Sequence, residues 1–297
     1  MIKHYLKVAF RNLMKYKTQS LVSIIGLAVG FTCFALSALW IRYEMTYDNF
    51  HKGSDRIYMV RAHYANEPGT SKFTPYPLME YLQDKMPEIE AATAFTPHHV
   101  KFRLEETEQE VGMIDADSVF MNFFDIQLLK GTVNFLKSDG QEVAITKEFA
   151  KRLFSKEEDA LGKEVEVGRR VCKIGAIVSG WSNHSNIPYN ILAPARHSPR
   201  WGSSNEQLFI RVRERTDIDV FRTKMSTIRI NDIEKESELS DLLITRMSAL
   251  RYSDYVDKAD VVISFSYIFY FLLGGRTGDY LFVIQLSDAF YQPALYA

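Results

Sequence analysis

The stretch LVSIIGLAVGFTCFALSALWI, from Leu21 to Ile41, contains no charged side chain. An α-helix of this length is about 30 Å long, which equals the thickness of the hydrocarbon core of a bilayer. The stretch therefore predicts a transmembrane helix bounded by Leu21 and Ile41, with the lipid membrane as a partner. Two alternatives stay open, a buried core helix and a cleaved signal peptide, whose apolar region is typically only about 7–15 residues long.

The residues before this stretch, 1–20, form a basic segment. Lys3, Lys7, Arg11 and Lys15 recur every four residues, so that they form one stripe on a helix with apolar residues on another face. This pattern is typical of an amphipathic helix at the membrane interface, where cations meet anionic lipid headgroups. Basic residues also mark the cytoplasmic side of a membrane helix, so we expect the remaining chain outside the cytoplasm. Nucleic acid is not an expected partner, because the stripe leads directly into the apolar stretch.

The charge of the chain is unevenly distributed. Residues 1–41 contain five of the 36 Lys and Arg residues and none of the 37 Asp and Glu residues. The net charge of −1 is therefore +5 in this part and −6 in the remainder. Such an asymmetry fits an anchor and a body that lie in different compartments.

The apolar stretch also contains a GxxxG spacing. Gly26 and Gly30 lie four residues apart, and small residues at this spacing allow a second membrane helix to approach closely. The spacing predicts a helix-packing face, although chance occurrence and simple exposure to lipid stay open as alternatives.

The following residues, 42–262, are numerous enough for one or two packed lobes. Strand-forming stretches alternate with short helical ones, which predicts an α+β extracytoplasmic domain. The expected strands are residues 56–64, 91–95, 100–104, 142–146, 164–167, 171–178, 208–212 and 242–247. Of these, 164–167 and 171–178 resemble a hairpin around Gly168. The expected helices are residues 76–86, 147–153 and 218–228, with a helical turn within 117–129.

Motifs of enzyme chemistry are absent from the sequence. It contains no GxxxxGK[ST] phosphate loop, no HExxH and no GxSxG, and its two cysteines exclude a Cys-based zinc site. Adjacent side chains of a strand point to opposite faces, so His98 and His99 are not expected to share a metal, and a loop or surface role is favoured. We therefore expect no catalytic residue, no cofactor and no metal site.

Two groups of charged residues have simple interpretations. The acidic run of Glu105, Glu106, Glu108 and Glu110 predicts a solvated strand edge or loop. The alternating residues Arg211, Arg213 and Arg215 predict a strand whose arginines face one side. A solvated sheet face is the favoured interpretation of these arginines, and a face for an anionic ligand is the alternative.

Beyond these patterns, the sequence resembles a known family. YEMTYDNFHKGSDRIYMV (residues 43–60) resembles the segment after the first transmembrane helix of FtsX/MacB-type ABC transporter permeases, especially those of Bacteroidetes. PYPLMEYLQDKMPEIEAAT resembles the first helix of the periplasmic core domain of that family. DADSVFMNFFDIQLLKG, VAITKEFAKRLFSKEEDALGKEVEVG and CKIGAIV follow in the order of the family. KVAFRNLMKYKTQSLVSIIGLAVG resembles its basic helix and first span, so the resemblance covers about residues 1–268.

The resemblance implies a MacB-like periplasmic core domain in two lobes. Lobe one would comprise about residues 48–112 and 205–262, and an inserted lobe would comprise about 113–204. The family further implies the bacterial inner membrane, with the N-terminus cytoplasmic and the main domain periplasmic. A cytosolic ABC ATPase, and other permease helices or a second permease, are the implied partners.

The tail, residues 263–297, departs from the family, whose members continue into three further membrane helices. The apolar run at residues 261–273 is too short to span a bilayer, and Gly274, Gly275 and Arg276 interrupt it. We interpret this aberrant tail as a second transmembrane helix lost by a frameshift near residues 268–272, with a natural divergent tail as the alternative. A chain truncated in this way is not expected to transport by itself.

Three functional classes follow from these observations. The favoured one is a non-enzymatic permease subunit, or a truncated fragment of one, that couples a cytosolic ATPase to a periplasmic domain for export or mechanotransmission. The alternative is a single-pass membrane sensor or signalling protein with an extracytoplasmic binding domain. A membrane-anchored periplasmic enzyme is disfavoured, because no catalytic constellation is recognisable.

Overall fold

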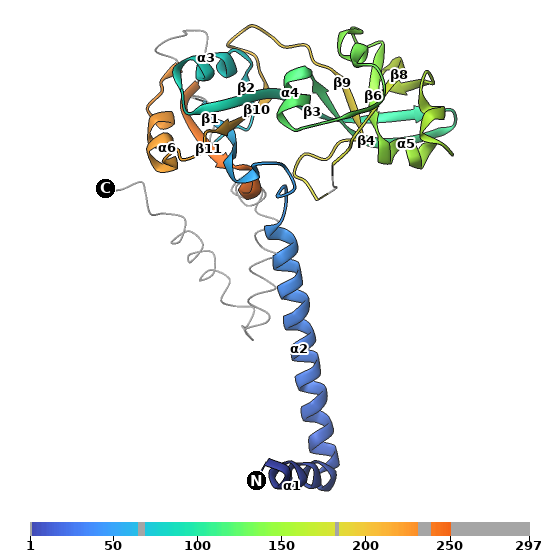
Figure 1. The fold of residues 1–297 in the computed structure, drawn as a ribbon, viewed down its shortest axis with the longest axis vertical. Helices are drawn as coiled ribbons and strands as arrows, with labels where there is room; N and C mark the ends of the chain where they lie inside the picture. The colour runs from blue at the N-terminus through green and yellow to red at the C-terminus, as the bar shows by residue number, and fades with distance from the viewer. Residues whose placement is uncertain (1, 65–68, 182–183, 231–238, 251–297) are drawn as a thin grey trace. The chain divides into compact units, whose positions relative to one another are not determined.

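The computed structural model describes residues 2–64, 69–181, 184–230 and 239–250 (Figure 1). By contacts the chain divides into two units, of which one contains residues 1–45 and the other Thr46–Asp257. The predicted tail at 263–297, and with it the frameshift interpretation, lies outside the described residues.

The described residues of the N-terminal unit form two helices. Helix α1 spans Ile2–Lys15 and α2 spans Lys17–Met45, and the chain turns between them at Tyr16, so that the two helices lie at a marked angle (Figure 1). Residues 17–43 are long and apolar enough to cross a membrane, and an 18-residue window within them has a mean hydropathy of 2.2. No residue of the apolar window is buried, and Leu27 and Phe31 are exposed by 76% and 70%. The predicted N-terminal apolar helix is therefore confirmed.

Helix α2 extends beyond the predicted boundaries, Leu21 and Ile41, at both ends. The flanking residues contain no proline or glycine that would end a helix, so helical hydrogen bonding continues from Lys17 to Met45. The apolar composition fixes the part that can lie in hydrocarbon, whereas the helix itself ends where the chain enters the second unit.

One of the two lobes of the second unit is built on a four-stranded antiparallel sheet. Its strands are β11 (Leu239–Arg246), β1 (Ile57–Tyr64), β10 (Ser204–Val212) and the first half of β3 (Ile89–Leu104), all antiparallel in this order. The short β2 (Thr74–Pro75) pairs with β10. We call this part of the molecule, with helices α3 (Pro77–Lys85) and α6 (Ile218–Ser226), the sheet lobe.

Both faces of this sheet are covered. Alternate residues such as Tyr58, Val60 and Ile210 pack against α3 and α6 in one buried cluster. The residues between them, such as Met59 and Phe209, pack on the other face against α4 (Ser118–Phe123) in a second cluster. Side chains alternate between the two faces of a strand, so a sheet buried on both faces needs apolar residues in succession, which explains the uninterrupted burial of residues 57–60.

The other lobe of the unit is a closed ring of strands, which we call the barrel lobe. Its order is β3 (second half), β4 (Thr107–Ala116), β9 (Ile191–Pro194), β6 (Glu142–Thr146), β8 (Arg170–Val178) and β7 (Glu164–Val167). Pairing of β7 with β3, at Phe102–Val167 and Arg103–Glu166, closes the ring. Strand β5 (Leu128–Gly131) pairs with β8, and helix α5 spans Lys147–Leu153. The short 3₁₀ helices are Ser54–Arg56, Val133–Lys137, Glu157–Ala160 and Met247–Ala249.

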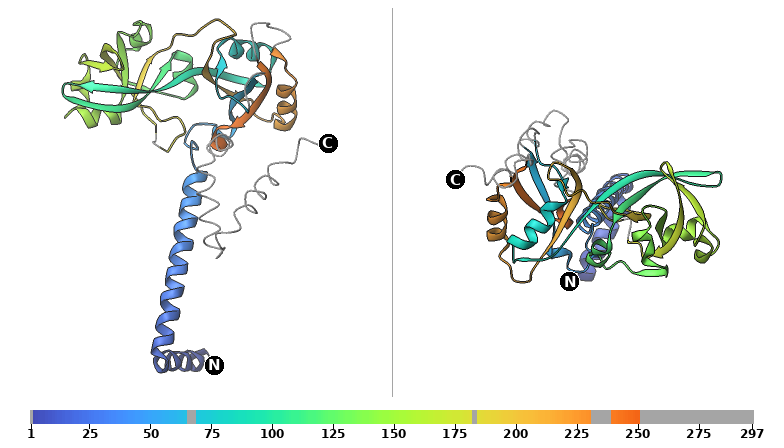
Figure 2. Two further views of the ribbon diagram at one scale, coloured as in Figure 1. Left: turned by 180° about the vertical axis from the view of Figure 1, so that it is seen from behind. Right: turned by 90° about the horizontal axis from the view of Figure 1, so that it is seen from above.

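Strand β3 belongs to both lobes. Its residues up to Phe95 pair with β10, and its residues from Thr96 onward pair with β4. The long β3–β4 ribbon therefore runs from one lobe into the other (Figure 2). The lobe boundary predicted at residues 112 and 113 falls inside β4, and the change of partner occurs at Thr96 instead.

The mixed α/β class of the domain is confirmed, and several elements agree closely with the sequence. Strand β6 and helix α5 have the predicted bounds, and β7 and β8 form the predicted hairpin around Gly168. The two strands predicted at 91–95 and 100–104 are a single strand, because Pro97 lies where β3 exchanges one partner for the other and does not break it. Half of the acidic run, Glu105 and Glu106, forms the turn between β3 and β4, and the other half lies in β4, where Arg103 and Lys101 of β3 pair with Glu108. Strands β2, β5 and β9 were not predicted, and β4 was anticipated only through the acidic run, as a strand edge or loop.

The prediction for the three alternating arginines is wrong. Strand β10 ends at Val212, and Arg215 has a positive φ of 65°, so the three residues do not share a strand face. Arg211 donates to the carbonyl oxygen of Phe123, and Arg213 donates to that of Pro87. These arginines therefore satisfy backbone carbonyl groups of neighbouring segments.

Candidate functional site

The interior of the barrel lobe follows from strand alternation. Every second residue of each strand points inward, and the inward residues form one buried cluster. Phe102 and Ile145 lie deep in this interior, and the ring of Phe149 from α5 contacts Phe102 with a centroid distance of 5.0 Å. This end of the barrel is therefore filled by aromatic and aliphatic side chains.

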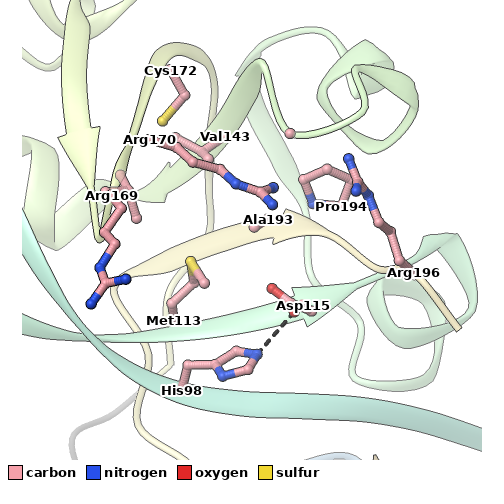
Figure 3. A pocket seen from close by; sticks show the side chains of 12 residues that line it. His98, Met113, Asp115, Val143, Arg169, Arg170, Cys172, Ala193, Pro194 and Arg196 are labelled. Carbon is pink, nitrogen blue, oxygen red and sulfur yellow. Dashed lines mark hydrogen bonds and ion pairs between the residues drawn. The ribbon is translucent and has the colours of Figure 1, made fainter.

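The opposite end of the barrel is open and holds a cavity of about 350 Å³ (Figure 3). The inward residues that line it are smaller or polar, and they come from successive strands of the ring. The lining residues are His98, Met113, Asp115, Gly140, Val143, Val167, Arg169, Arg170, Cys172, Ala193, Pro194 and Arg196. The cavity thus combines an apolar floor with a polar, mostly cationic rim.

The polar side of the cavity contains a histidine–aspartate pair. His98 Nε2 lies 2.9 Å from Asp115 Oδ2 across the β3–β4 ribbon. Burial raises the pKa of Asp115, and the neighbouring charges of His98 and Arg170 lower it in part. His98 was expected in a loop or surface role; it lies in a strand, points to the cavity and is separated from His99, as the alternation rule predicts.

The cations of the rim lie in two places. Arg169 lies in the turn between β7 and β8 and Arg170 is the first residue of β8, and neither has an ion-pair or side-chain hydrogen-bond partner among the described residues. Arg196 follows β9 and donates to the carboxylate of Asp139 at 2.5 Å and to its carbonyl oxygen at 2.8 Å. Two guanidinium groups of the rim are therefore available to a ligand.

The cavity carries no recognisable catalytic machinery. Burial raises the pKa of the Cys172 thiol to about 11, so that a thiolate nucleophile is disfavoured at neutral pH. Among the described residues, no group of three or more His, Cys, Asp or Glu side chains could hold a metal ion. The arrangement is suited to holding a ligand by charge and apolar contact.

A second polar cluster fixes the chain just after α2. Asp48 is fully buried, and its carboxylate accepts hydrogen bonds from the Ser185 hydroxyl at 2.5 Å and from the side-chain and backbone nitrogens of Asn186 at 2.6 and 3.1 Å. Its own N–H donates to the carbonyl oxygen of His184. Burial raises the pKa of Asp48, and these hydrogen bonds offset the increase only in part. The short linker that follows α2 is thereby attached to the loop at residues 184–187.

A third cluster surrounds His197, in the connection from β9 back to β10. Its Nδ1 lies 3.0 Å from Glu206 of β10, and its Nε2 lies 3.4 Å from Asp117, the N-cap residue of α4. The ring stacks on Tyr76 with a centroid distance of 3.9 Å. Burial alone would lower the pKa of His197, but the two carboxylates outweigh it and raise the pKa to about 9. His197 is therefore a partly buried cation that links β10 to the start of α4.

The sequence-predicted membrane residues lie on the N-terminal unit. Lys3, Lys7, Arg11 and Lys15 lie on α1, where Arg11 and Lys15 are exposed. Gly26 and Gly30 lie on α2, and no described atom lies within 4 Å of a Cβ built at either position. The membrane-interface stripe and the helix-packing face stay predictions.

Sequence reasoning missed the cavity residues and both buried clusters. Arg169 and Arg170 follow Gly168, and adjacent arginines in a predicted hairpin turn are a signal that could have drawn attention to them. No such signal exists for Asp48, His197 or Asp115, because their partners lie 138, 9 and 17 residues away and no local spacing marks the pairs.

Comparison with known proteins agrees with this architecture. The sequence profile of the MacB-like periplasmic core domain matches residues 20–228. A search of curated protein sequences gave no match. Among solved structures, a domain described as part of a permease protein from Porphyromonas gingivalis is similar at 19% identity and a TM-score of 0.54, over 66% of this chain and 91% of that one.

Two further structures are similar at lower scores. They are the periplasmic region of MacB from Actinobacillus actinomycetemcomitans, with 12% identity, a TM-score of 0.48 and coverage of 69% and 94% of the two chains, and the extracellular domain of the noncanonic ABC-type transporter YknZ from Gram-positive bacteria, with 14%, 0.47 and coverage of 64% and 99%. Identities this low show likeness of fold alone. The sequence profile covers more than half of the chain, and the protein therefore belongs to the MacB-like periplasmic core domain family.

Proposed function

We propose that this protein is a permease subunit of a MacB/FtsX-type ABC transporter, which couples a cytosolic ATPase to its periplasmic domain for export or mechanotransmission. The observation that carries the proposal is the family match, which runs without interruption from residue 20 through the apolar helix and into the domain as far as residue 228. The chain contains no phosphate-binding loop motif, so ATP hydrolysis is assigned to the partner.

The linker supplies a route for movement in this proposal. Helix α2 ends at Met45, and only three residues later Asp48 is buried and hydrogen-bonded within the domain. A short and firmly attached linker transmits a displacement, whereas a long flexible one would absorb it. The segment from Thr46 to His51 is thus the place where movement of the membrane helix would enter the domain.

The proposal assigns no enzymatic reaction to the domain. Its cavity offers arginines and an apolar floor, without a nucleophile placed beside a base. Binding and transmission are the activities that such a site supports.

A second candidate function is a single-pass sensor that detects a ligand outside the cytoplasm. The observation that favours it is the cavity of the barrel lobe, which lies in the domain and not on the helices. Association with an ATPase distinguishes the two, because a sensor requires none.

Membrane orientation is tested by cysteine labelling in intact cells. Cys33 is replaced by Ala, and single cysteines are introduced as Ser20→Cys and Lys52→Cys, where both positions are exposed or partly exposed. Cys172 is buried, with a raised pKa, and contributes little background. We expect a membrane-impermeant maleimide to label Lys52→Cys and not Ser20→Cys until the cells are permeabilised. Labelling in the opposite order contradicts the periplasmic location.

The ATPase partnership is tested with the full chain in lipid nanodiscs and the cytosolic ABC ATPases of the same organism, each added in turn. We expect a stable complex and a changed rate of ATP hydrolysis, and we expect Asp48→Ala to preserve the complex but to weaken the change in rate, because it loosens the linker. Asp84→Ala, at an exposed site of α3, is the matched control. Absence of a complex with the wild-type chain would leave the sensor as the better account.

A further inference from the structure

The cavity of the barrel lobe has no role in the coupling function proposed above. We propose that it binds a small anionic amphiphile, whose apolar body enters the open end of the barrel and whose head contacts Arg169 and Arg170. This inference rests on the geometry of the barrel lobe alone, so it holds for a permease and for a sensor.

The apolar body is accommodated by the inward residues at the open end. Met113, Val143, Val167, Cys172 and Ala193 each come from a different strand of the ring and form the wall and floor. The next inward layer is filled by large side chains, whereas these residues leave a cavity of about 350 Å³. An apolar surface that is partly enclosed, and left unfilled by its own protein, is suited to apolar groups of a ligand.

The rim favours an anionic head because its carboxylate is already hydrogen-bonded, whereas, within the described part of the chain, two of its arginines are not. Asp115, the carboxylate that lines the cavity, is hydrogen-bonded to His98 and is also within reach of the charge of Arg170, and Arg196 of the rim is bonded to Asp139. The two cations at the β7–β8 turn lack such partners among the described residues (Figure 3). Guanidinium groups form strong, geometrically defined hydrogen bonds with carboxylates and phosphates, so the unpaired side of the rim favours an anion over a cation.

Gly140 contributes space for this head. It lies opposite the turn, and a Cβ built on it would be 3.3 Å from Nη1 of Arg170. Its φ of +84° is also one that other residues rarely adopt. The absence of a side chain at this position leaves the guanidinium group of Arg170 free to approach a ligand in the mouth of the cavity.

The volume limits the class of ligand. Pockets for small molecules are typically about 300–1,000 Å³, so this cavity lies at the lower end. It therefore suits a short amphiphile, or the terminal part of a longer one, with a single anionic head. A carboxylate head and a phosphate head share the required chemistry, and they are compared directly in the experiment.

The test is isothermal titration of the full chain in lipid nanodiscs, with empty nanodiscs as the blank. The probes are hexanoate and hexyl phosphate, with hexanol and hexylamine as neutral and cationic counterparts of the same length. The double variant Arg169→Gln/Arg170→Gln removes the head site, and Ala193→Phe fills the apolar site. Arg222→Gln, at an exposed arginine of α6, is the matched control.

We expect saturable binding of at least one anionic probe and none of hexanol or hexylamine. The double variant should weaken that binding by about tenfold or more, since each charge-assisted contact is lost, and the control should not. The probe that binds more tightly identifies the head as carboxylate or phosphate. Binding of Ala193→Phe should be absent at the concentrations that saturate the wild type.

Several results would overturn the proposal. These are no saturable binding of either anion, equal binding of hexanol, or an unchanged affinity in the double variant. Arg169 and Arg170 are exposed, so the double variant is expected to fold even if Ala193→Phe does not. The titration contains no ATPase, so its failure is separate from a failure of the coupling function.

Discussion

Two histidines of the same domain, one buried and one partly buried, have pKa values that are shifted in opposite directions. His51 follows the membrane helix and contacts the rings of Phe50, Phe124 and Trp181, and burial, with a contribution from Arg211, lowers its pKa to about 4. His197 lies between two carboxylates, and its pKa is raised to about 9 against the effect of its burial. Burial is common to both, so the nearest charged atoms decide the protonation state.

The distance to the carboxylate explains the difference. His51 Nε2 is 4.0 Å from Asp48, and Asp48 already accepts three hydrogen bonds from Ser185 and Asn186. His197 has carboxylate oxygens at 3.0 and 3.4 Å on its two ring nitrogens. Because the Asp48 carboxylate is hydrogen-bonded to other groups and lies 4.0 Å from His51, it does not raise the pKa of His51. The two residues are therefore in contact without forming an ion pair. The domain therefore contains an acid-sensitive position and an alkali-sensitive one.

The largest expected effect comes from removing the carboxylate beside the neutral histidine. Asp48→Ala leaves the donors of Ser185 and Asn186 without an acceptor, and it places alanine at a φ of 57°. We expect the free energy of unfolding to fall by about 4 kcal/mol. Urea unfolding of the full chain in detergent, followed by tryptophan fluorescence, measures this loss.

Asp48→Asn provides the control for this variant. Asparagine tolerates the left-handed conformation, keeps one acceptor oxygen and removes the cost of burying a charge. We expect it to retain most of the stability that alanine loses. Equal losses in both variants would show that the carboxylate charge itself is needed, contrary to the raised pKa of Asp48.

The next effect concerns the charged histidine and is visible as a pH dependence. The pKa of His197 rises from 6.5 in the unfolded chain to about 9 in the folded one, so folding takes up a proton between these values. The stabilisation is complete below about pH 6.5 and is lost as the pH rises through 9, by about 3 kcal/mol in total. His197→Gln should be destabilised by this amount at pH 6 and should match the wild type at pH 9. If the difference in free energy of unfolding between the two proteins stays constant from pH 6 to 9, His197 is not protonated in the folded state.

The smallest of the three effects lies on the acid side. The pKa of His51 falls from 6.5 to about 4 on folding, so the unfolded state binds the proton more readily and stability is lost as the pH falls from 6.5 towards 4. The charged groups that face this ring are Asp48 and Arg211. His51→Phe keeps the aromatic contacts and has no titrating group. Between pH 7 and pH 5, the free energy of unfolding of this variant should fall by about 2 kcal/mol less than that of the wild type. An unchanged acid dependence in this variant would assign the effect to other groups.

Local patterns in the sequence predicted a good part of the fold. The helix Lys147–Leu153 is capped by Thr146, whose hydroxyl accepts a hydrogen bond from the backbone N–H of Phe149. Such a cap depends only on neighbouring residues, so it can be identified from the sequence. Strand β6 and the hairpin around Gly168 are equally local. By contrast, β9 contains only four residues, and its pairing with β4 and β6 is formed across long separations. A strand this short carries too little pattern to be identified without its partners.

The sequence by itself determined the apolar helix, its basic flank and the α/β class of the domain, because these depend on the composition and spacing of neighbouring residues. Only the tertiary structure decided the closure of the barrel at Phe102 and Val167, the cavity with its unpaired arginines, and the opposite charge states of His51 and His197. Each of these depends on distances between residues that are remote in the chain. A pKa or a cavity is set by what surrounds a side chain in space, and the order of residues along the chain does not specify those surroundings locally.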